Sequence, residues 1–196
     1  MARPNIINKQ VLIDAAKVCL VEKGIEKFTL KAVAEEAGVT QGTVYYHFRT
    51  KEQLLLDVVK DICDRSWNDI AQQQDHKDMI KHALESAKSR CSNDAFFHQL
   101  FFTLTVAGFK NEKIREQLAE ILQAENQALS QSLSKVWQHS PIDGVSLETW
   151  GIFFNALVDG LAIQNLMLEN FQVETFFEEL EQLFIGLSQL SNNKTS

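Results

Sequence analysis

Long runs of helical periodicity with few breaks constrain the fold of this chain more than any other feature. Its 196 residues include only 2 prolines and 8 glycines, and between them apolar residues recur at intervals of three and four. No segment shows the alternation typical of a strand or an internal repeat. Because 45% of the residues are apolar and 23% are charged, the chain can bury a substantial core. The sequence therefore predicts an all-α protein.

Helix-start and helix-stop residues divide the chain into about nine helices. Asn8, Thr29 and Thr40 are placed to cap the first three. Gly24 and Gly38 follow the first two, where a left-handed glycine often ends a helix. The expected ranges are 11–23, 30–37, 41–48, 51–74, 77–91, 94–107, 112–138, 147–169 and 173–190.

The charge distribution indicates two parts with different roles. Residues 1–50 contain seven Lys or Arg against five Asp or Glu, a balance of +2, whereas the rest contain twelve against twenty-one, a balance of −9. Thr50 opens the sequence TKEQ, a capping box in which Gln53 can return a hydrogen bond, so that a long helix from Lys51 links the two parts. We expect a head domain at residues 1–50 and a body at residues 51–196.

The segment TQGTVYYHF, residues 40–48, has an unusual outward face. At about 100° per residue on a helix, Val44 and Phe48 point to one side, while Gly42 and Tyr46 point nearly opposite. This outward face carries glycine, hydroxyls and aromatic rings but no acidic residue. Helix, helix, short glycine turn, helix is the outline of a helix-turn-helix, so a DNA groove is the expected partner. The alternative is that the tyrosines pack against the rest of the chain.

The outward residues suit two kinds of DNA contact. Gln41 can pair with adenine or another base edge, and Gly42 lets the backbone approach the duplex. Thr43 and Tyr46 can contact a thymine methyl group. Arg49 and Lys51 add positive charge at the far end of the helix. The residues suited to phosphate oxygens are Tyr45, His47 and Lys51.

The stretch from Val11 to Leu55 resembles the DNA-binding domain of the TetR family of bacterial transcription regulators. The resemblance is closest over TLKAVAEEAGVTQGTVYYHFRTKEQLL and rests on the Ala-x-x-x-Gly-Val turn from Ala34 to Val39, on Gly42, and on the Tyr-x-His-Phe run. It implies that bases or the nearby backbone are contacted by Lys31, Gln41, Thr43 and Tyr46. It also implies that phosphates are contacted by Thr29, Thr40, Tyr45, His47 and Lys51.

Aromatic residues are concentrated in the acidic body. Any single one is explained most simply as core, but adjacent pairs such as Phe153–Phe154 point about 100° apart and must serve more than one surface. One such surface is a candidate cavity for a small, largely apolar effector, which the family resemblance also implies. The candidate ligand-binding residues are Phe97, Phe101, Phe102, Trp150 and Phe154.

The last two long helices are candidates for a homodimer interface. Gly151, Ala156, Gly160 and Ala162 allow close helix approach, and an apolar stripe follows in the last helix at Phe176, Leu180, Leu183, Leu187 and Leu190. Paired with their symmetry mates, two such helices form a four-helix interface. The family resemblance implies the same mode of dimerisation.

Other classes of function find little support in the sequence. The three cysteines lie within helical patterns without metal-ligand spacing, and the histidines, including His98, suit surface or cap positions better than ligand positions. No nucleophile elbow or glycine-rich phosphate loop occurs, so no catalytic residue, metal or cofactor is expected. Without a signal peptide or an apolar run of about 18 residues, a cytoplasmic protein with no membrane partner is expected.

These observations predict a homodimeric, sequence-specific DNA-binding regulator. By the family resemblance it is a repressor that a small apolar ligand releases from a palindromic operator in double-stranded DNA. The alternative from another class is a helical carrier or interaction protein that binds a small apolar molecule without DNA.

Overall fold

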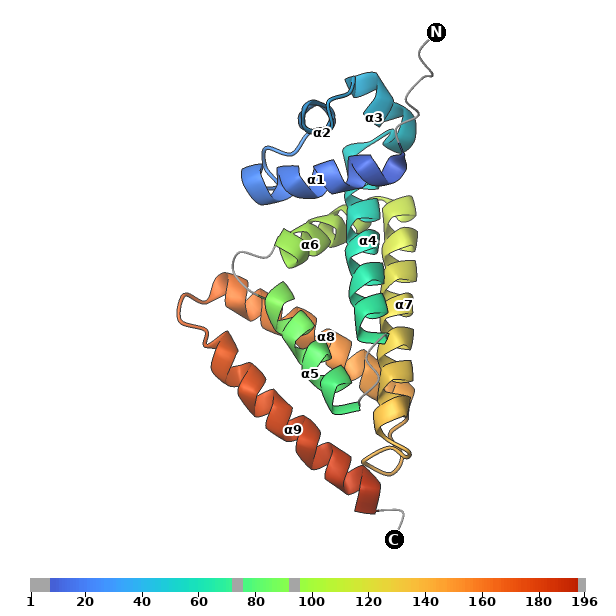
Figure 1. The fold of residues 1–196 in the computed structure, drawn as a ribbon, viewed down its shortest axis with the longest axis vertical. Coiled ribbons are helices and arrows are strands. Elements are labelled where there is room, and N and C mark those ends of the chain that lie inside the picture. Colours follow the sequence, from blue (N-terminus) through green and yellow to red (C-terminus); the bar gives the residue numbers. More distant parts are fainter. Residues whose placement is uncertain (1–7, 72–75, 92–95, 194–196) are drawn as a thin grey trace. The chain divides into compact units, whose positions relative to one another are not determined.

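The structure is a computed structural model that describes residues 8–71, 76–91 and 96–193. Within these residues the chain forms nine α-helices and no strand (Figure 1), which confirms the all-α prediction. Residues 72–74 and 94–95 of the expected helices lie outside the described ranges. The helices are α1 Lys9–Lys23, α2 Leu30–Glu36, α3 Gln41–Phe48, α4 Lys51–Ala71, α5 His76–Arg90, α6 Phe96–Gly108, α7 Glu112–Val136, α8 Leu147–Met167 and α9 Val173–Asn193.

The helices are shared between two compact units. The first contains the chain up to Ile62 together with Gln99–Leu118, and the second contains Cys63–His98 and the chain from Ala119 onward. Helices α4, α6 and α7 each contribute residues to both units. The first unit therefore includes more of the chain than the head expected at residues 1–50.

The expected N-cap residues of the first three helices are confirmed. The side chains of Asn8, Thr29 and Thr40 accept hydrogen bonds from backbone N–H groups in the first turns of α1, α2 and α3. Each such cap stabilises a helix by about 1 kcal/mol, which matters most for the short α2 and α3. Gly24 and Gly38 have φ of 72° and 66°, a region that glycine enters without steric strain.

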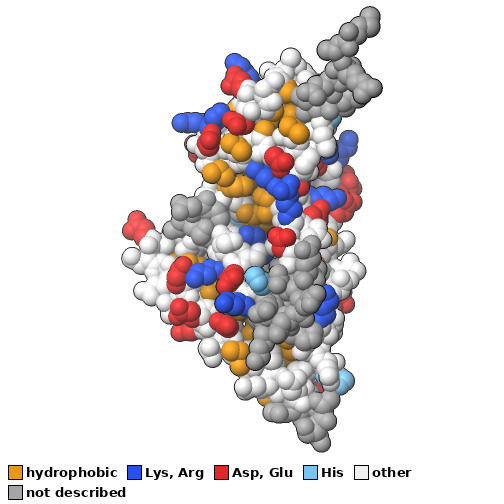
Figure 2. Space-filling view, in the orientation of Figure 1, with side chains coloured by type: hydrophobic (Ala, Val, Ile, Leu, Met, Phe, Trp, Pro, Cys, Tyr) orange, Lys and Arg blue, Asp and Glu red, His pale blue; other side chains and the backbone are white. Residues whose placement is uncertain are grey.

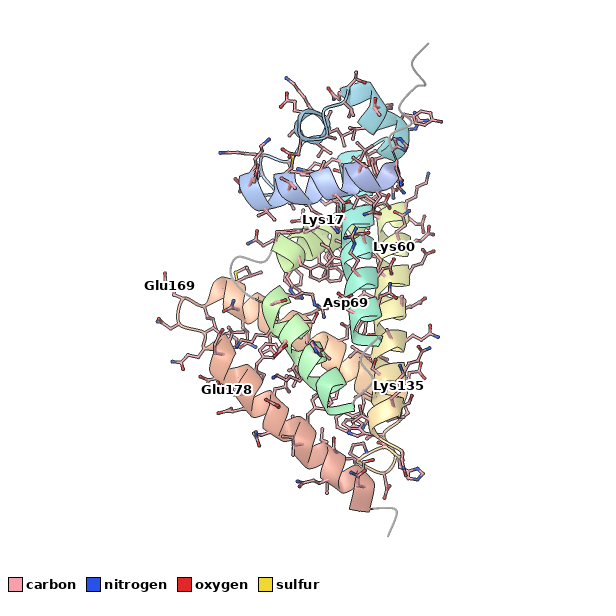
Figure 3. All side chains as sticks on the ribbon, in the orientation of Figure 1. Lys17, Lys60, Asp69, Lys135, Glu169 and Glu178 are labelled. Atoms are coloured by element: carbon pink, nitrogen blue, oxygen red, sulfur yellow. The ribbon has the colours of Figure 1, made fainter. Side chains whose placement is uncertain are left out.

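The core of the first unit joins α1, α2, α3 and α4. Its completely buried side chains include Leu12, Val33, Val44, Phe48 and Leu54. A polar contact also fastens α1 to α4, because the ammonium of Lys17, which is labelled on α1 in Figure 3, pairs with the Asp61 carboxylate. The Gln10 amide donates a second hydrogen bond to Asp61 at 3.0 Å. These contacts, made at the middle of α4, hold the first half of this helix against α1 within the first unit.

A tight turn at Arg49 joins α3 to α4. The N–H of Thr50 donates to the carbonyl of Phe48 at 2.6 Å, and Arg49 has φ 61° and ψ −46°, which is the geometry of a γ-turn. The predicted capping box forms only in part. The Thr50 hydroxyl accepts from the Gln53 N–H at 3.1 Å, but the Gln53 side chain donates to Asp57 at 3.4 Å. The turn already occupies the Thr50 N–H that the box requires.

Aromatic rings from three segments stack in the core of the second unit. The rings of Phe154 and Phe184 have centroids 4.5 Å apart, and Trp137 stacks on Phe184 at 5.6 Å. Trp150 stacks on Phe154 at 5.7 Å. The indole N–H of Trp137 donates to the Ser188 hydroxyl at 2.9 Å, so this buried donor is satisfied. The stack joins the end of α7 to α8 and α9.

Helices α7 and α8 approach closely at Gly151. A Cβ atom at this position would lie 2.8 Å from the carbonyl oxygen of Asn126 and 3.1 Å from the amide nitrogen of Ser130. Beside this point the Asn155 amide donates to the Asn126 side chain at 2.9 Å. Of the small residues expected to allow close helix contact, Gly151 allows the contact between α7 and α8 of the same chain. Gly160 has no described atom within 4 Å of its Cβ position.

Candidate nucleic-acid interface and ligand cavity

Helix α3 presents the outward face that the sequence predicts. Val44 and Phe48 are completely buried, whereas Tyr45 is 53% exposed and Tyr46 is 71% exposed. The two tyrosines therefore do not pack into the core, and the alternative interpretation of them is wrong. Of the other predicted DNA contacts, the exposed ones are Thr29, Lys31, Thr40, Gln41 and Gly42, and the half-buried ones are Thr43, His47 and Lys51.

Arg49 completes this surface with more than the positive charge that the sequence suggested at the end of the helix. Its guanidinium lies 5.5 Å from the ring centroid of Tyr45 and 5.8 Å from that of Tyr46. Such cation–π contacts contribute about 0.5–1 kcal/mol at exposed sites and restrict the rings to fewer orientations. The γ-turn directs the Arg49 side chain back over the preceding helix, which its position in the sequence does not reveal.

The threonines at the start of α3 cap the helix and leave one hydroxyl proton available. The Thr40 hydroxyl accepts from the Thr43 N–H at 3.2 Å, and the two hydroxyl oxygens lie 3.0 Å apart. One hydroxyl proton is used between them, which leaves the other for an outside acceptor such as a phosphate oxygen. Thr29 likewise caps α2 by accepting from the Ala32 N–H at 3.0 Å and keeps its own proton.

The two lysines predicted to contact DNA have different surroundings. Lys51 is half-buried, donates to the carbonyl of Ile25 at 3.1 Å, and lies 5.6 Å from the ring centroid of Phe28. Its ammonium keeps two further N–H donors, but the side chain also holds the start of α4 in place. Lys31 is exposed and lies 3.8 Å from Glu35 one turn along α2. An exposed pair of this kind contributes little energy, so Lys31 is free to move.

A small cavity lies within the second unit, between residues of α4, α5, α7, α8 and α9. Its volume is about 70 Å³. The polar residues in its wall are Trp67, Arg90, Ser132 and Asn155, and the apolar ones include Leu84, Leu129, Leu133, Phe154, Val158 and Phe184. Pockets that hold drug-sized ligands occupy about 300–1,000 Å³. A ligand of that size would have to push the walls apart.

The polar part of the wall is built around Arg90. Its Nη1 atom lies 3.2 Å from Oε1 of Glu125, and both side chains are largely buried. Burial raises the pKa of the Cys63 thiol well above its ordinary value, and a hydrogen bond to the adjacent Glu125 carboxylate adds to this shift. The Arg90 Nε–H and the Trp67 indole N–H are shielded from solvent and meet no acceptor in the described part of the chain.

The predicted ligand-binding aromatic residues do not all meet at this cavity. Phe154 is in its wall, and Trp150 stacks behind Phe154. Phe97 lies 5.4 Å from the Arg90 guanidinium, while Phe101 and Phe102 belong to the first unit. Sequence reasoning missed Trp67 and Arg90 because it considered aromatic residues only beyond position 75. The sequence signal that could have pointed to this cavity was Trp67, a large aromatic residue near the end of the long amphipathic helix α4.

His98 is not the surface or cap residue that the sequence suggested. It is buried, with Nδ1 2.8 Å from the carbonyl oxygen of Arg90 and Nε2 3.2 Å from a carboxylate oxygen of Asp159. Near it, the Asn165 amide donates to the carbonyl of Cys91 at 2.6 Å. These bonds fix the end of α5 against α8. Across residues 8–71, 76–91 and 96–193, no group of His, Cys, Asp and Glu is arranged to hold a metal ion.

Helix α8 and helix α9 each leave one apolar face uncovered. The exposed apolar residues of α8 are Ile152, Phe153, Ala156, Ile163 and Met167. In α9 the predicted stripe divides, because Leu180 and Leu187 are buried within the chain while Leu183 and Leu190 are exposed. By contrast, the groove between α5 and α9 is lined by Lys81, Lys88, Glu174 and Glu178, and Figure 2 shows mixed charges there. Exposed apolar residues that share one face of a helix commonly mark an interaction site.

Comparison with known proteins identifies the DNA-binding part. Residues 12–58 match the model of bacterial regulatory proteins of the tetR family. The HTH-type transcriptional regulator SrpR of Pseudomonas putida is 26% identical over 179 residues, covering 85% of this chain and 78% of the relative. No helix in the part of the chain that the structure describes is long and apolar enough to span a membrane.

Solved structures share the fold. A TetR-family transcriptional regulator from Rhodococcus sp. has a TM-score of 0.72 at 19% identity and covers 92% of this chain and 97% of its own. The multidrug binding protein EbrR, solved in complex with imidazole, has a TM-score of 0.59 at 19% identity and covers 93% and 94%. This chain therefore resembles TetR-family transcription regulators in its DNA-binding residues 12–58, along most of its length and in its fold.

Proposed function

We propose that this protein is a homodimeric repressor that binds a palindromic operator and leaves it when a small, largely apolar effector enters the cavity of the second unit. The observation that carries the proposal is the outward face of α3, where Tyr45 and Tyr46 are exposed beneath the Arg49 guanidinium. Exposed apolar surface that is gathered in one place commonly marks an interaction site. The proposed site of action is DNA in the cytoplasm.

The residues of this face would divide between reading bases and holding phosphates. Gln41 and Tyr46 are exposed on the side of α3 opposite the core, where they suit base edges in the major groove. Thr40 and Arg49 offer a hydroxyl proton and a charge to phosphate oxygens. Lys51 would bring its positive charge close to the DNA backbone while its ammonium still donates a hydrogen bond to the carbonyl of Ile25.

Tyr46→Ala is expected to abolish much of the discrimination between operator variants. Loss of one base contact costs about 1–3 kcal/mol at the affected base pair and little elsewhere. Operators would first be selected from genomic fragments with the wild-type protein and then titrated by fluorescence anisotropy at one salt concentration. Val21→Ala is the control, since Val21 is about as exposed as Tyr46 but lies in α1.

Two outcomes would count against the DNA-binding proposal. Unchanged affinity and selectivity in Tyr46→Ala would show that α3 does not read the groove. Failure of the wild-type protein to select any fragment would favour the carrier alternative, in which the cavity binds a small apolar molecule and no DNA is recognised.

A dimer is proposed because a palindromic operator presents two half-sites. Recognition helices that enter successive major grooves must be about 34 Å apart, so one separation of the two heads allows both to dock. The exposed apolar faces of α8 and α9 support pairing of two copies through these helices. The charged side chains of the groove between α5 and α9 favour exposure to solvent over burial in an interface between two copies.

Helix α4 is the proposed connection between effector and DNA. Lys51 at its start is bonded to Ile25, and Trp67 near its end is in the wall of the cavity. An effector too large for a cavity of about 70 Å³ must displace part of the wall. Displacement of α4 would change the separation of the heads. A coupling of about 1–3 kcal/mol would change operator affinity several-fold to a hundredfold.

We expect an effector to lower operator affinity and, in the same concentration range, to shift or broaden the distance between the heads. The physical reason is that release requires tighter effector binding to the splayed state than to the docked state. Spin labels at Val21 of each protomer, an exposed position of α1 outside the predicted DNA contacts, would report the distance distribution with and without effector. Reduced operator affinity with an unchanged distribution, width included, would contradict the proposed movement and indicate local disordering of α3.

A further inference from the structure

Two hydrogen-bond donors in the cavity wall have no acceptor in the described part of the chain. The indole Nε1–H of Trp67 and the Nε–H of Arg90 are both removed from solvent, and neither meets an acceptor among the described residues. Both residues line the cavity of the second unit. An indole and a guanidinium donate hydrogen bonds but accept none. The complementary ligand group is therefore an acceptor.

A buried donor without a partner is unfavourable in the free protein. Leaving such a group unpaired forfeits the hydrogen bond that it makes with water in the unfolded chain. The other indole N–H groups of the second unit avoid this, because Trp137 donates to Ser188 at 2.9 Å and Trp150 donates to Ser140 at 3.1 Å. Trp67 differs from them in its location in the cavity wall.

The charges around Arg90 limit what kind of acceptor fits. The guanidinium in the wall already pairs with the buried Glu125 carboxylate behind it, with Nη1 3.2 Å from Oε1, so its positive charge is compensated. An anionic ligand would bring a second carboxylate beside Glu125 in a medium of low dielectric constant, where like charges repel strongly. A cationic ligand would be repelled by Arg90, and the lining residues include no carboxylate to pair with it. A neutral ligand avoids both penalties.

We infer that the effector is an uncharged, largely apolar compound whose carbonyl or ether oxygen accepts hydrogen bonds from Trp67 and Arg90. This inference rests on the proposed function for its biological meaning, because that function makes the cavity an effector site. The apolar wall residues, such as Leu129 and Leu133, would contact the hydrocarbon part. The two donors would fix its orientation and distinguish it from a hydrocarbon of the same shape.

Small aromatic probes of matched shape test the preference in the full-length protein without DNA. Acetophenone carries a neutral acceptor, isopropylbenzene has the same outline without one, and benzoate and benzylammonium add a negative or a positive charge. Dissociation constants would come from ligand-detected NMR titrations. We expect acetophenone to bind about tenfold more tightly than each of the other three, since one buried hydrogen bond has about this value.

Trp67→Phe assigns the preference to the indole. This change removes the N–H and keeps an aromatic ring, so the ratio of acetophenone to isopropylbenzene affinity should fall by about threefold or more while isopropylbenzene still binds. Retained hydrocarbon binding shows that the cavity remains formed. Arg90→Lys, which keeps the charge opposite Glu125 but lacks Nε, should lower the same ratio. Trp137→Phe is the matched control and should leave the ratio unchanged, because its N–H is bonded to Ser188.

Equal affinity for acetophenone and isopropylbenzene, tighter binding of benzoate, or no binding of any probe at millimolar concentration would each overturn the inference. Operator selection measured on the same preparations is independent of these titrations. A protein that prefers acetophenone but selects no DNA fragment would contradict the proposed function and leave the acceptor preference standing. A protein that selects DNA but binds acetophenone and isopropylbenzene equally would contradict the acceptor preference and leave the proposed DNA-binding function standing.

Discussion

Leu183→Glu is expected to convert the protein from dimer to monomer and to lower its operator affinity at least about a hundredfold. Leu183 is 49% exposed on α9 and lies on the same face as the exposed Leu190. In a symmetric interface the substitution buries an unpaired carboxylate twice, which costs several kcal/mol. Tight operator binding depends on both half-sites, and avidity of about 10²–10⁴ is lost with the second head. Sedimentation velocity and operator titration measure the two effects.

The choice of residue follows from the structure. Phe177 is equally apolar in the sequence, but it is buried within the chain, so Phe177→Glu would disrupt the core and leave the interface untested. Val21→Glu places the same charge on an exposed apolar position of α1 and serves as the control. A wild-type protein that sediments as a monomer at micromolar concentration, or a Leu183→Glu protein that remains a dimer, would contradict pairing through this face.

Gly151→Ala is expected to lower the unfolding temperature markedly, although alanine favours helix formation. The added methyl group would lie 2.8 Å from the carbonyl oxygen of Asn126 and 3.1 Å from the amide nitrogen of Ser130, and both atoms belong to the backbone of α7. Backbone atoms of a helix cannot rotate away as a flexible side chain can. Overpacking of this kind costs about 1–3 kcal/mol, and for a chain of this size each kcal/mol lowers the unfolding temperature by about 2–4 °C.

Gly160→Ala is the matched control in the same helix. Its added methyl group meets no described atom within 4 Å, so helix propensity alone should stabilise the variant by about 1 kcal/mol. Both variants would be compared in the Leu183→Glu background, where contacts between copies do not contribute. Calorimetry should then show opposite shifts. A Gly151→Ala protein that melts at or above the temperature of its parent would mean that α7 and α8 are not packed this closely.

Local signals in the sequence were enough to predict the helices and the exposed outward face of α3. Helix periodicity and few breaks predicted the nine helices that the structure describes, and Thr29 and Thr40 were identifiable as caps because their hydroxyls act on N–H groups three residues away. The exposure of Tyr46 opposite Val44 also followed from sequence, since both lie on one short helix whose geometry is fixed by the peptide backbone.

The turn after α3 shows where local reasoning fails. The capping box predicted at Thr50 is only half formed, because the Thr50 N–H donates to Phe48 in the turn at Arg49. The same turn directs the Arg49 guanidinium over Tyr45 and Tyr46. Two local hydrogen-bonding patterns competed for one donor, and their difference in free energy is too small to judge from residue types.

The sequence by itself determined which residues are apolar, how they repeat, and therefore the helices and the outward face of α3. Only the tertiary structure decided how the apolar residues divide between core, cavity and surface. In α9 it buries Leu180 and Leu187 but leaves Leu183 and Leu190 exposed, and it places Trp67 and Arg90 in one cavity wall although 23 positions separate them in the sequence. The physical reason is that the hydrophobic effect drives burial without specifying a partner, so the packing of distant helices selects among faces that are equally apolar.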